Sequence, residues 1–172
     1  MLTGEVIFPP MPTELATERF LLTREELGDA GWLATLFTAR GGGTVTVEQA
    51  CARIAAMHAL TRDHGIGAYV LRPRDGDAPV GYAAVIIGRR TAEEPELAYE
   101  LLPEAHGRGY AAEAARVVLS AAFSTGRRRV WATVRPWNSA SLRVLDKLGG
   151  FTLDRTTTDD QGQVLWFVCD GA

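Results

Sequence analysis

Cysteine is scarce in this chain of 172 residues, and long apolar runs are missing. The two cysteines, Cys51 and Cys169, lie far apart and follow no metal-ligand spacing, so the sequence predicts neither a disulfide framework nor a zinc site. No stretch of about 20 apolar residues occurs, and residues 1–15 lack the basic and apolar regions of a signal peptide. We therefore expect reduced thiols, no membrane span and a cytoplasmic protein. His58 and His64 are expected on the surface of a helix rather than as ligands.

An excess of positive charge is also missing, because the formal net charge is −3. Nucleic acids and anionic membranes are held mainly by Lys and Arg in excess, so neither is an expected partner. Basic residues do gather at positions 127–129, with Arg135 nearby. This cluster is open to two interpretations, a site for a small anion or a solvated loop before a strand.

With 47% hydrophobic residues, the chain is long enough for one well-buried core. We expect a single domain over residues 1–172, in which residues 1–13, rich in proline, form an irregular lead-in. The alternation of strand and helix periodicity predicts an α/β fold, a mixed sheet with helices on both faces. The expected elements are a strand at 17–23, helices at 24–39 and 46–64, strands at 65–73, 78–88 and 95–103, a helix at 110–126, a strand at 128–136, a helix at 138–150, and strands at 151–158 and 163–168.

Local signals mark several ends of these elements. Thr44 or Thr46 is expected to cap the second helix, and Asn138 is expected to cap the last one. Gly126 is a typical residue after a helix end. The Asp-Gly pair within residues 74–77 lies between two apolar runs and predicts a β-hairpin.

The stretch PEAHGRGYAAEA, residues 103–114, places Gly107 and Gly109 between a strand and an alanine-rich helix. Such a turn suits phosphate, since glycine permits close approach of the backbone and a helix start offers unpaired amides. It also matches the dinucleotide fingerprint G-x-G-x-x-A. A dinucleotide fold is disfavoured because the motif comes late in the chain and the strand at 128–136 lacks an acidic end, although Arg135 keeps an NADP site as an alternative. No G-K-[ST] follows, which excludes a P-loop.

The strand ending in LLP, the turn HGRGYA, the alanine-rich helix, the next strand and NSASLRVLDKLGGF together resemble the GNAT superfamily of acetyl-CoA-dependent N-acetyltransferases. The opening LATERFLLT is similar to its ribosomal-protein N-acetyltransferase branch. The resemblance extends over about residues 14–168. The family's turn pattern [Q/R]-x-x-G-x-[G/A] falls on His106, Gly109 and Ala111, and His106 departs from the usual Gln or Arg.

The resemblance implies a mixed, mostly antiparallel sheet in which the strand at 97–103 splays from the strand at 130–134. The pantetheine arm of acetyl-CoA, the co-substrate, would enter the gap like an added strand, with no metal involved. A main-chain amide near Leu101 or Leu102 would polarise the thioester carbonyl. The residues that the resemblance assigns to the cofactor are Leu101, Leu102, His106, Gly107, Arg108, Gly109, Tyr110, Ala111, Asn138 and Ser141.

Acetyl transfer to nitrogen needs a neutral amine, so a base must remove a proton from it. In a strand, Glu96, Ala98 and Glu100 share one face. An acidic face is not expected in the core, which makes it a candidate acceptor cleft. Glu100 is the first candidate for the base and Glu96 the second. The alternative, that both glutamates are solvated or paired with arginines, remains open.

The departing thiolate can take a proton from a hydroxyl group. Many family members have a tyrosine seven residues after the asparagine, where this chain has Leu145. Ser141 is then the candidate acid, unless the thiolate leaves unprotonated or Ser141 only binds pantetheine. Tyr110 is expected to pack at the helix start, and Arg143 and Lys147 to lie near the phosphates or in solvent.

The glycines at 40–44 are interpreted as a linker that, by the resemblance, borders the acceptor site. Trp32 and Trp137 are candidates for its walls or for the core. Cys51 in a helix and Cys169 in the last strand are not placed for a covalent intermediate, which favours direct attack in a ternary complex.

The sequence therefore predicts an N-acetyltransferase that moves acetyl from acetyl-CoA to a primary amine, either a protein N-terminus or a small molecule. A CoA-binding regulatory module without catalysis and an NADP-dependent reductase are the alternatives. A homodimer is suggested by the resemblance alone.

Overall fold

The computed structural model describes residues 7–76 and 78–172. Its elements alternate in a pattern close to the expected one, with one strand more. In chain order they are β1 (Glu14–Ala16), β2 (Phe20–Arg24), the 3-10 turn η1 (Leu27–Asp29), α1 (Ala30–Ala39), α2 (Val47–His64), β3 (Ala68–Pro73), β4 (Gly81–Ile86), β5 (Glu96–Leu101), η2 (Pro103–Ala105), α3 (Tyr110–Ser124), β6 (Arg129–Val134), α4 (Ser139–Leu148), β7 (Thr152–Asp159) and β8 (Gly162–Asp170).

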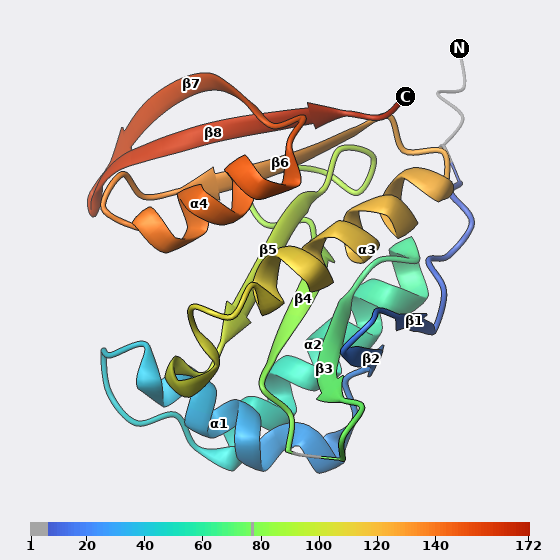
Figure 1. Ribbon diagram of the computed structural model, residues 1–172, viewed down its shortest axis with the longest axis vertical. Coiled ribbons are helices and arrows are strands. Elements are labelled where there is room, and N and C mark those ends of the chain that lie inside the picture. The colour runs from blue at the N-terminus through green and yellow to red at the C-terminus, as the bar shows by residue number, and fades with distance from the viewer. Residues whose placement is uncertain (1–6, 77) are drawn as a thin grey trace.

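The strands form one sheet in the order β1-β2-β3-β4-β5-β6-β8-β7. Neighbours are antiparallel except β5 and β6, which are parallel. Figure 1 shows that β6, β7 and β8 run at a steep angle to β3, β4 and β5. The α/β class and the mixed, mostly antiparallel sheet are thus confirmed.

Helices cover both faces of the sheet, as predicted (Figure 1). On one face α3 contributes Ala114, Ala115 and Val118 to the larger core, where they meet buried side chains of β2 to β6. On the other face α1 and α2 form a second core with Ala68, Tyr82 and Ala84. Each buried aliphatic side chain contributes roughly 1.5–3 kcal/mol, so these two layers hold the sheet in place.

The start of the chain departs from the expected order in two places. The strand predicted at 17–23 corresponds to β2, and the unexpected strand β1 precedes it in a hairpin closed by a bond from the Thr17 amide to the Phe20 carbonyl at 2.9 Å. The helix predicted from residue 24 begins only at Ala30, because Arg24 still belongs to β2 and Glu26 starts η1. Polar side chains that bond to nearby amides compete with the helix here, since the Glu26 amide donates to Asp29 Oδ2 at 2.9 Å.

Both predicted N-caps are confirmed, and the capping residue of α2 is Thr46 rather than Thr44. Thr46 Oγ1 accepts from the Gln49 amide at 3.1 Å, and Asn138 Oδ1 accepts from the Ser141 amide at 3.1 Å. Gly126 lies after α3 with a φ of 88°. The hairpin between β3 and β4 is confirmed by their antiparallel register, although the predicted turn at 74–77 includes Asp77, outside the described residues.

The lead-in, of which residues 1–6 lie outside the described part, is irregular at 7–13 but attached to the core. The Met11 amide donates to the Gly65 carbonyl at 2.8 Å, and the Tyr69 hydroxyl donates to the Pro12 carbonyl at 2.6 Å. Met11 is buried. These contacts fix the lead-in against the start of β3.

The basic cluster at 127–129, open to interpretation as a small-anion site or a solvated loop, lies at the start of β6, and two of its three arginines have partners within the protein. Arg127 is buried and donates to the carbonyls of Ala92 and His64, both at 2.8 Å. Arg129 pairs with Asp170, and Arg135 pairs with Asp159 at 2.9 Å. These arginines bind the protein itself. Because Arg135 is paired with Asp159, it is not free to bind the 2′-phosphate of NADP, and this was the reason for considering an NADP site.

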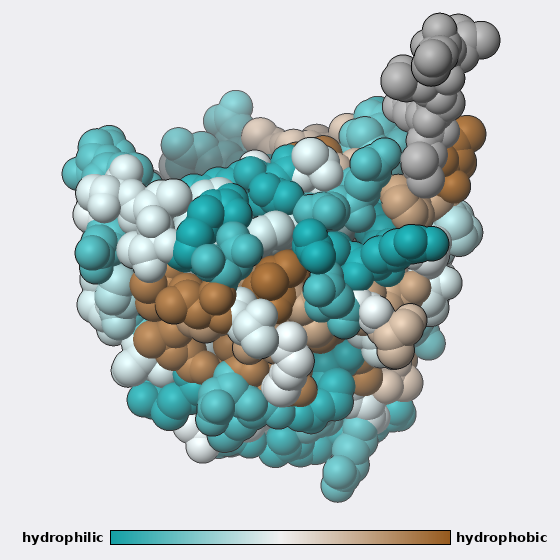
Figure 2. All heavy atoms as spheres, turned by 90° about the horizontal axis from the view of Figure 1, so that it is seen from above, coloured by the Kyte–Doolittle hydropathy of each residue, from teal (hydrophilic) through white to brown (hydrophobic). Residues whose placement is uncertain are grey.

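The surface seen from above combines a hydrophobic area with surrounding hydrophilic residues (Figure 2).

Among the described helices none is long and apolar enough to cross a membrane. Both cysteines, Cys51 and Cys169, are free thiols. His58 is an exposed residue of α2, as expected, and its Nε2 lies 2.6 Å from the Glu25 carbonyl.

Candidate active site

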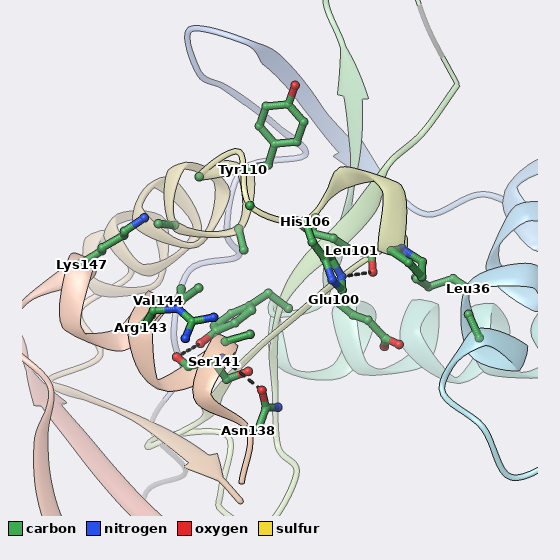
Figure 3. Close-up of a pocket in the computed structure, with 18 of the residues that line it drawn as sticks. Leu36, Glu100, Leu101, His106, Tyr110, Asn138, Ser141, Arg143, Val144 and Lys147 are labelled. Atoms are coloured by element: carbon green, nitrogen blue, oxygen red, sulfur yellow. Dashed lines mark hydrogen bonds between the residues drawn. The ribbon is translucent and has the colours of Figure 1, made fainter. Parts of the chain in front are cut away.

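A cavity of about 750 Å³ opens between the end of α1, the C-terminal half of β5, the start of α3 and the first turns of α4. Figure 3 shows Glu100 on the α1 side of this cavity, with Arg143 and Lys147 on the opposite side. Ligand pockets have volumes of this order, roughly 300–1,000 Å³. The cavity joins most of the predicted site residues in one place.

The cavity exists because β5 and β6 diverge. Their register pairs Glu96 with Trp131, and the Trp131 amide donates to the Pro95 carbonyl at 2.8 Å, both at the start of β5. Further along, Tyr99 and Leu101 line the cavity instead. The predicted splay of the central strand pair is confirmed. Backbone groups on the open side of β5 are thereby exposed to a ligand that lies along the strand.

The glycine turn forms the wall at the start of α3. Gly107 and Gly109 have φ values of 76° and 78°, a region that side-chain-bearing residues rarely adopt. Gly109 is the N-cap of α3, and since it has no side chain, it cannot cap the first amides of the helix. Unpaired amides and the positive end of a helix are the arrangement that suits a bound anion. Gly107, Gly109, Tyr110 and Ala111 line the cavity as predicted.

Arg19, the residue before β2, holds the turn in place, a contact that sequence reasoning missed. Its Nη1 donates to the Arg108 carbonyl at 3.0 Å, and its Nε donates to Glu113 Oε2 at 2.6 Å. The guanidinium lies 4.6 Å from the centre of the Tyr110 ring, which packs edge-on against Phe20. The packing role predicted for Tyr110 is confirmed, and Figure 3 shows its ring pointing away from the other labelled residues of the cavity. No local signal could have paired Arg19 with a helix so distant in sequence.

His106, the departure from the family pattern, binds the protein backbone. Its Nε2 lies 3.0 Å from the Leu101 carbonyl, which ties the turn to the end of β5. Two predicted cofactor residues do not line the cavity. The Leu102 amide donates to the Val80 carbonyl at 2.8 Å and is not available to a thioester, and Arg108 faces the Arg19 side. Leu101 is the residue at this end of β5 that the cavity reaches.

Glu100 lies at the α1 end of the cavity and is paired with Arg40, the residue after α1. Arg40 Nε donates to both carboxylate oxygens at 2.7 Å, and Nη2 also contacts Oε2. The Tyr82 hydroxyl accepts from Arg40 Nη2 at 3.1 Å and lies 3.3 Å from Glu100 Oε2. Hydrogen bonding to Glu100 raises the pKa of Arg40, and burial raises that of Tyr82. The arginine pairing considered for Glu100 is therefore present.

Glu96 does not belong to the site. It is buried, accepts from the Arg89 amide at 3.0 Å and contacts the Thr133 hydroxyl. It does not line the cavity. The expectation that the Glu96 face would be outside the core was wrong for this residue, because a backbone amide and a hydroxyl satisfy its carboxylate inside the protein. Ala98, between the two glutamates, packs on the second core.

On the opposite side, α4 presents Asn138 and Ser141 to the cavity, as predicted. The Tyr99 hydroxyl donates to the Ser141 carbonyl at 3.1 Å and thereby links β5 to α4 across the gap. Burial raises the pKa of Tyr99 to about 12, so it stays protonated at neutral pH. Leu145, at the position of the absent tyrosine, is buried against β6. The alternation of side chains in a strand puts Tyr99 on the face opposite Glu100, and Tyr99 was not among the predicted site residues.

Two tryptophans were candidates for the wall, and one of them is there. Trp137 lines the cavity with 78% of its surface exposed. Trp32 instead donates from Nε1 to Asp29 at 3.0 Å and packs on the second core. The linker at 40–44 joins α1 and α2 and contributes Arg40 to the cavity.

The sequence model of a protein family, the acetyltransferase (GNAT) domain, matches residues 17–150 of this chain. Sequence comparison with curated proteins finds no match. Among solved structures, a Bordetella pertussis protein assigned to the GNAT family is 26% identical, with a TM-score of 0.80 over 92% of this chain and 99% of the other. The Vibrio fischeri ribosomal-protein-S5-alanine acetyltransferase is 18% identical, with a TM-score of 0.77 over 92% and 97%.

A third structure, yncA of Salmonella typhimurium with its cofactor acetyl-CoA, is 16% identical, with a TM-score of 0.72 over 89% of this chain and 94% of the other. At such identities the last two likenesses concern the fold. The family model, in contrast, spans the cavity from β2 to the end of α4. The chain belongs to the GNAT acetyltransferase family.

Proposed function

We propose that this acetyltransferase moves the acetyl group of acetyl-CoA to a primary amine, by direct attack within a ternary complex. One observation carries the proposal: the glycine turn at the start of α3 and two cations line one end of a cavity, and a carboxylate, Glu100, lines the other. The C-terminal half of β5 and the helix α4 line the space between the two ends. A cofactor with phosphates and a reactive thioester far apart fits such a cavity.

The phosphate end suits the pyrophosphate of CoA. The uncapped amides of Gly109 and the residues after it would donate hydrogen bonds to the phosphate oxygens, and the glycines at 107 and 109 allow the close approach. A side chain at Gly107 would meet nothing within 4 Å in the protein, so the space above it is open for a ligand. Arg143 and Lys147 line the same side and add positive charge. The solved structure of yncA with acetyl-CoA supports this choice of cofactor.

At the other end Glu100 serves as the base, directly or through a water molecule. A lysine-like amine has a pKa of about 10.4 and an α-amine one of about 7.7–8.0, so the acceptor arrives largely or partly protonated. Once deprotonated, its nitrogen attacks the thioester carbon, and the negative charge that develops on the carbonyl oxygen is stabilised by a backbone amide of β5 near Leu101.

The nitrogen of the intermediate still has one proton too many. As the carbon–sulfur bond breaks, the nitrogen loses this proton and the thiolate of CoA departs and is protonated, so that the products are a neutral amide and the free thiol of CoA. Ser141 lines the cavity next to Asn138 and is the candidate proton donor for this sulfur. Tyr99 holds the first turn of α4 in place through the Ser141 carbonyl. Neither Cys51 nor Cys169 lines the cavity, which agrees with attack by the amine itself rather than through an acetylated thiol.

Calorimetric titration with acetyl-CoA, run beside NADPH, tests the cofactor, and an acetylation assay over a panel of primary amines tests the reaction. We expect micromolar binding of acetyl-CoA, no binding of NADPH, and release of free CoA with at least one amine. Binding of acetyl-CoA without turnover over the whole panel would identify a regulatory CoA-binding module. Absence of acetyl-CoA binding would overturn the assignment of the cavity.

A further inference from the structure

The acceptor end of the cavity contains a feature that direct acetyl transfer does not require. Glu100, the proposed base, is held by Arg40 through two bonds of 2.7 Å from Nε and a further contact from Nη2. A carboxylate bound to a guanidinium in this way has both oxygens in contact with N–H donors, so an incoming amine has no free oxygen to approach. Something must take Arg40 from Glu100 before the base can act.

Arg40 does not depend on Glu100 for its position. Its guanidinium lies 4.5 Å from the centre of the Phe37 ring and donates from Nη2 to the Tyr82 hydroxyl at 3.1 Å. Within the described chain none of its hydrogen bonds involves Nη1. The arginine can therefore stay where it is and exchange Glu100 for another carboxylate.

The charge of the cavity favours such an exchange. Glu100 is the one carboxylate among the described residues that line it, against the cations Arg40, Arg143 and Lys147. Figure 3 shows Arg143 and Lys147 on the side away from Glu100, where the phosphates of CoA would neutralise them. Arg40 alone lies at the acceptor end, so its charge is left for the acceptor.

We propose that Arg40 selects an acceptor whose primary amine has a carboxylate on the same or the next carbon atom. The carboxylate binds Arg40, Glu100 is released, and the amine then lies beside the freed base. Because Arg40 and Glu100 are in direct contact, both groups of the acceptor must be close to one another. This inference rests on the proposed acetyl transfer and names the substrate class of the same site. A free amino acid and a peptide N-terminus with an acidic first residue both have this chemistry.

The test compares kcat/KM for matched acceptors with and without the carboxylate. Alanine against alaninamide represents the free amino acid, and Asp-Ala-Ala-amide against Asn-Ala-Ala-amide represents the peptide. Arginine–carboxylate bonds contribute enough to change affinity by roughly 10-fold to 150-fold. We therefore expect a ratio of at least about 10 in favour of the carboxylate in one of the two pairs, which identifies the source. Amides have the less basic amine, so intrinsic reactivity at neutral pH cannot produce this preference.

Arg40→Gln should reduce this ratio to about one. Arg40→Lys keeps the positive charge but not the planar guanidinium that binds both oxygens of a carboxylate, so it should give an intermediate ratio. This second variant keeps the proposal testable if Arg40→Gln does not fold. The control is Arg62→Gln, which removes an exposed arginine paired with Asp63 on α2 and should leave the ratio as in the wild type.

A ratio near one in the wild type for both pairs, or a high ratio that survives Arg40→Gln, would overturn the role of Arg40 while acetyl transfer itself stands. Absence of turnover with every amine would overturn the proposed function, and this inference with it.

Discussion

The glycine turn permits a test in which backbone strain and ligand binding are separated. Gly109 has a φ of 78°, and a Cβ added there would meet only Arg19 Nη2, at 3.7 Å. Gly109→Ala therefore introduces no clash, and its cost is the left-handed conformation of about 1–2 kcal/mol. Gly126, after the other end of α3, has a φ of 88° and no neighbour within 4 Å of an added Cβ. Gly126→Ala is thus the matched control, with the same strain and no contact with the cavity.

Both variants should lower the melting temperature by a similar amount, roughly 2–8 °C for a domain of this size. Only Gly109→Ala should weaken acetyl-CoA binding, because the methyl group occupies the approach of the pyrophosphate to the amides at the start of α3. The loss of one charge-assisted bond of about 1.5–3 kcal/mol corresponds to roughly 10-fold to 150-fold in Kd. Calorimetry and thermal unfolding on the same samples give both quantities. Equal Kd values in the two variants would show that the phosphates bind elsewhere.

Three further changes examine the base, the interior and the cap of α4. Glu100→Gln should lower kcat by roughly 100-fold to 10,000-fold at neutral pH without a change in acetyl-CoA affinity, and unaltered turnover would remove Glu100 from the mechanism. Burial raises the pKa of Glu25 from 4.5 to about 7, so the stability that its protonated form contributes below pH 4.5 is lost as the pH rises to 7. The free energy of unfolding of the wild type should therefore fall by about 3 kcal/mol, and urea unfolding at pH 5 and pH 8 should show that this pH dependence is abolished in Glu25→Gln. The same pH dependence in the variant and the wild type would contradict the raised pKa of Glu25. Asn138→Ala should cost about 1 kcal/mol in urea unfolding and raise the KM for acetyl-CoA, and an unaltered KM would leave Asn138 with the cap alone.

Much of the fold could be predicted because its signals are local. Thr46 and Asn138 are N-caps because the side-chain oxygen of each accepts a hydrogen bond from the backbone amide three residues later. Both bonds are present in the structure. The hairpin of β1 and β2 was missed because β1 has only three residues, too few for a periodic pattern. The start of α1 was missed for a different reason. Glu26 and Asp29 bond locally around η1, and no hydrophobic period reports such competition.

The two ends of the site differ in how far the sequence reveals them. The end of the cavity at the glycine turn is made of contiguous backbone, so the sequence motif at residues 106–111 is enough to predict it. The acceptor end is made of side chains from different elements, so Glu100 could be proposed from strand periodicity, but its contact with Arg40 could not. Glu96 shows the limit of the same periodicity. Strand alternation puts Glu96 on the same side of β5 as Glu100. Its burial could not be predicted, because it depends on the Arg89 amide and the Thr133 hydroxyl, which lie elsewhere in the chain.

This division between backbone and side chains has a consequence for specificity. A change at Arg40 alters the acceptor end without touching the amides of the turn, because α1 and the start of α3 contribute to opposite sides of the cavity. The three glycines after Arg40 have no neighbours within 4 Å of an added Cβ, so insertions or substitutions there meet no packed side chains. The strained backbone at Gly41, Gly42 and Gly43 is the main constraint on that loop. Acceptor choice can therefore vary in this chain while cofactor binding is conserved, and the acceptor must be established from the side chains at the α1 end.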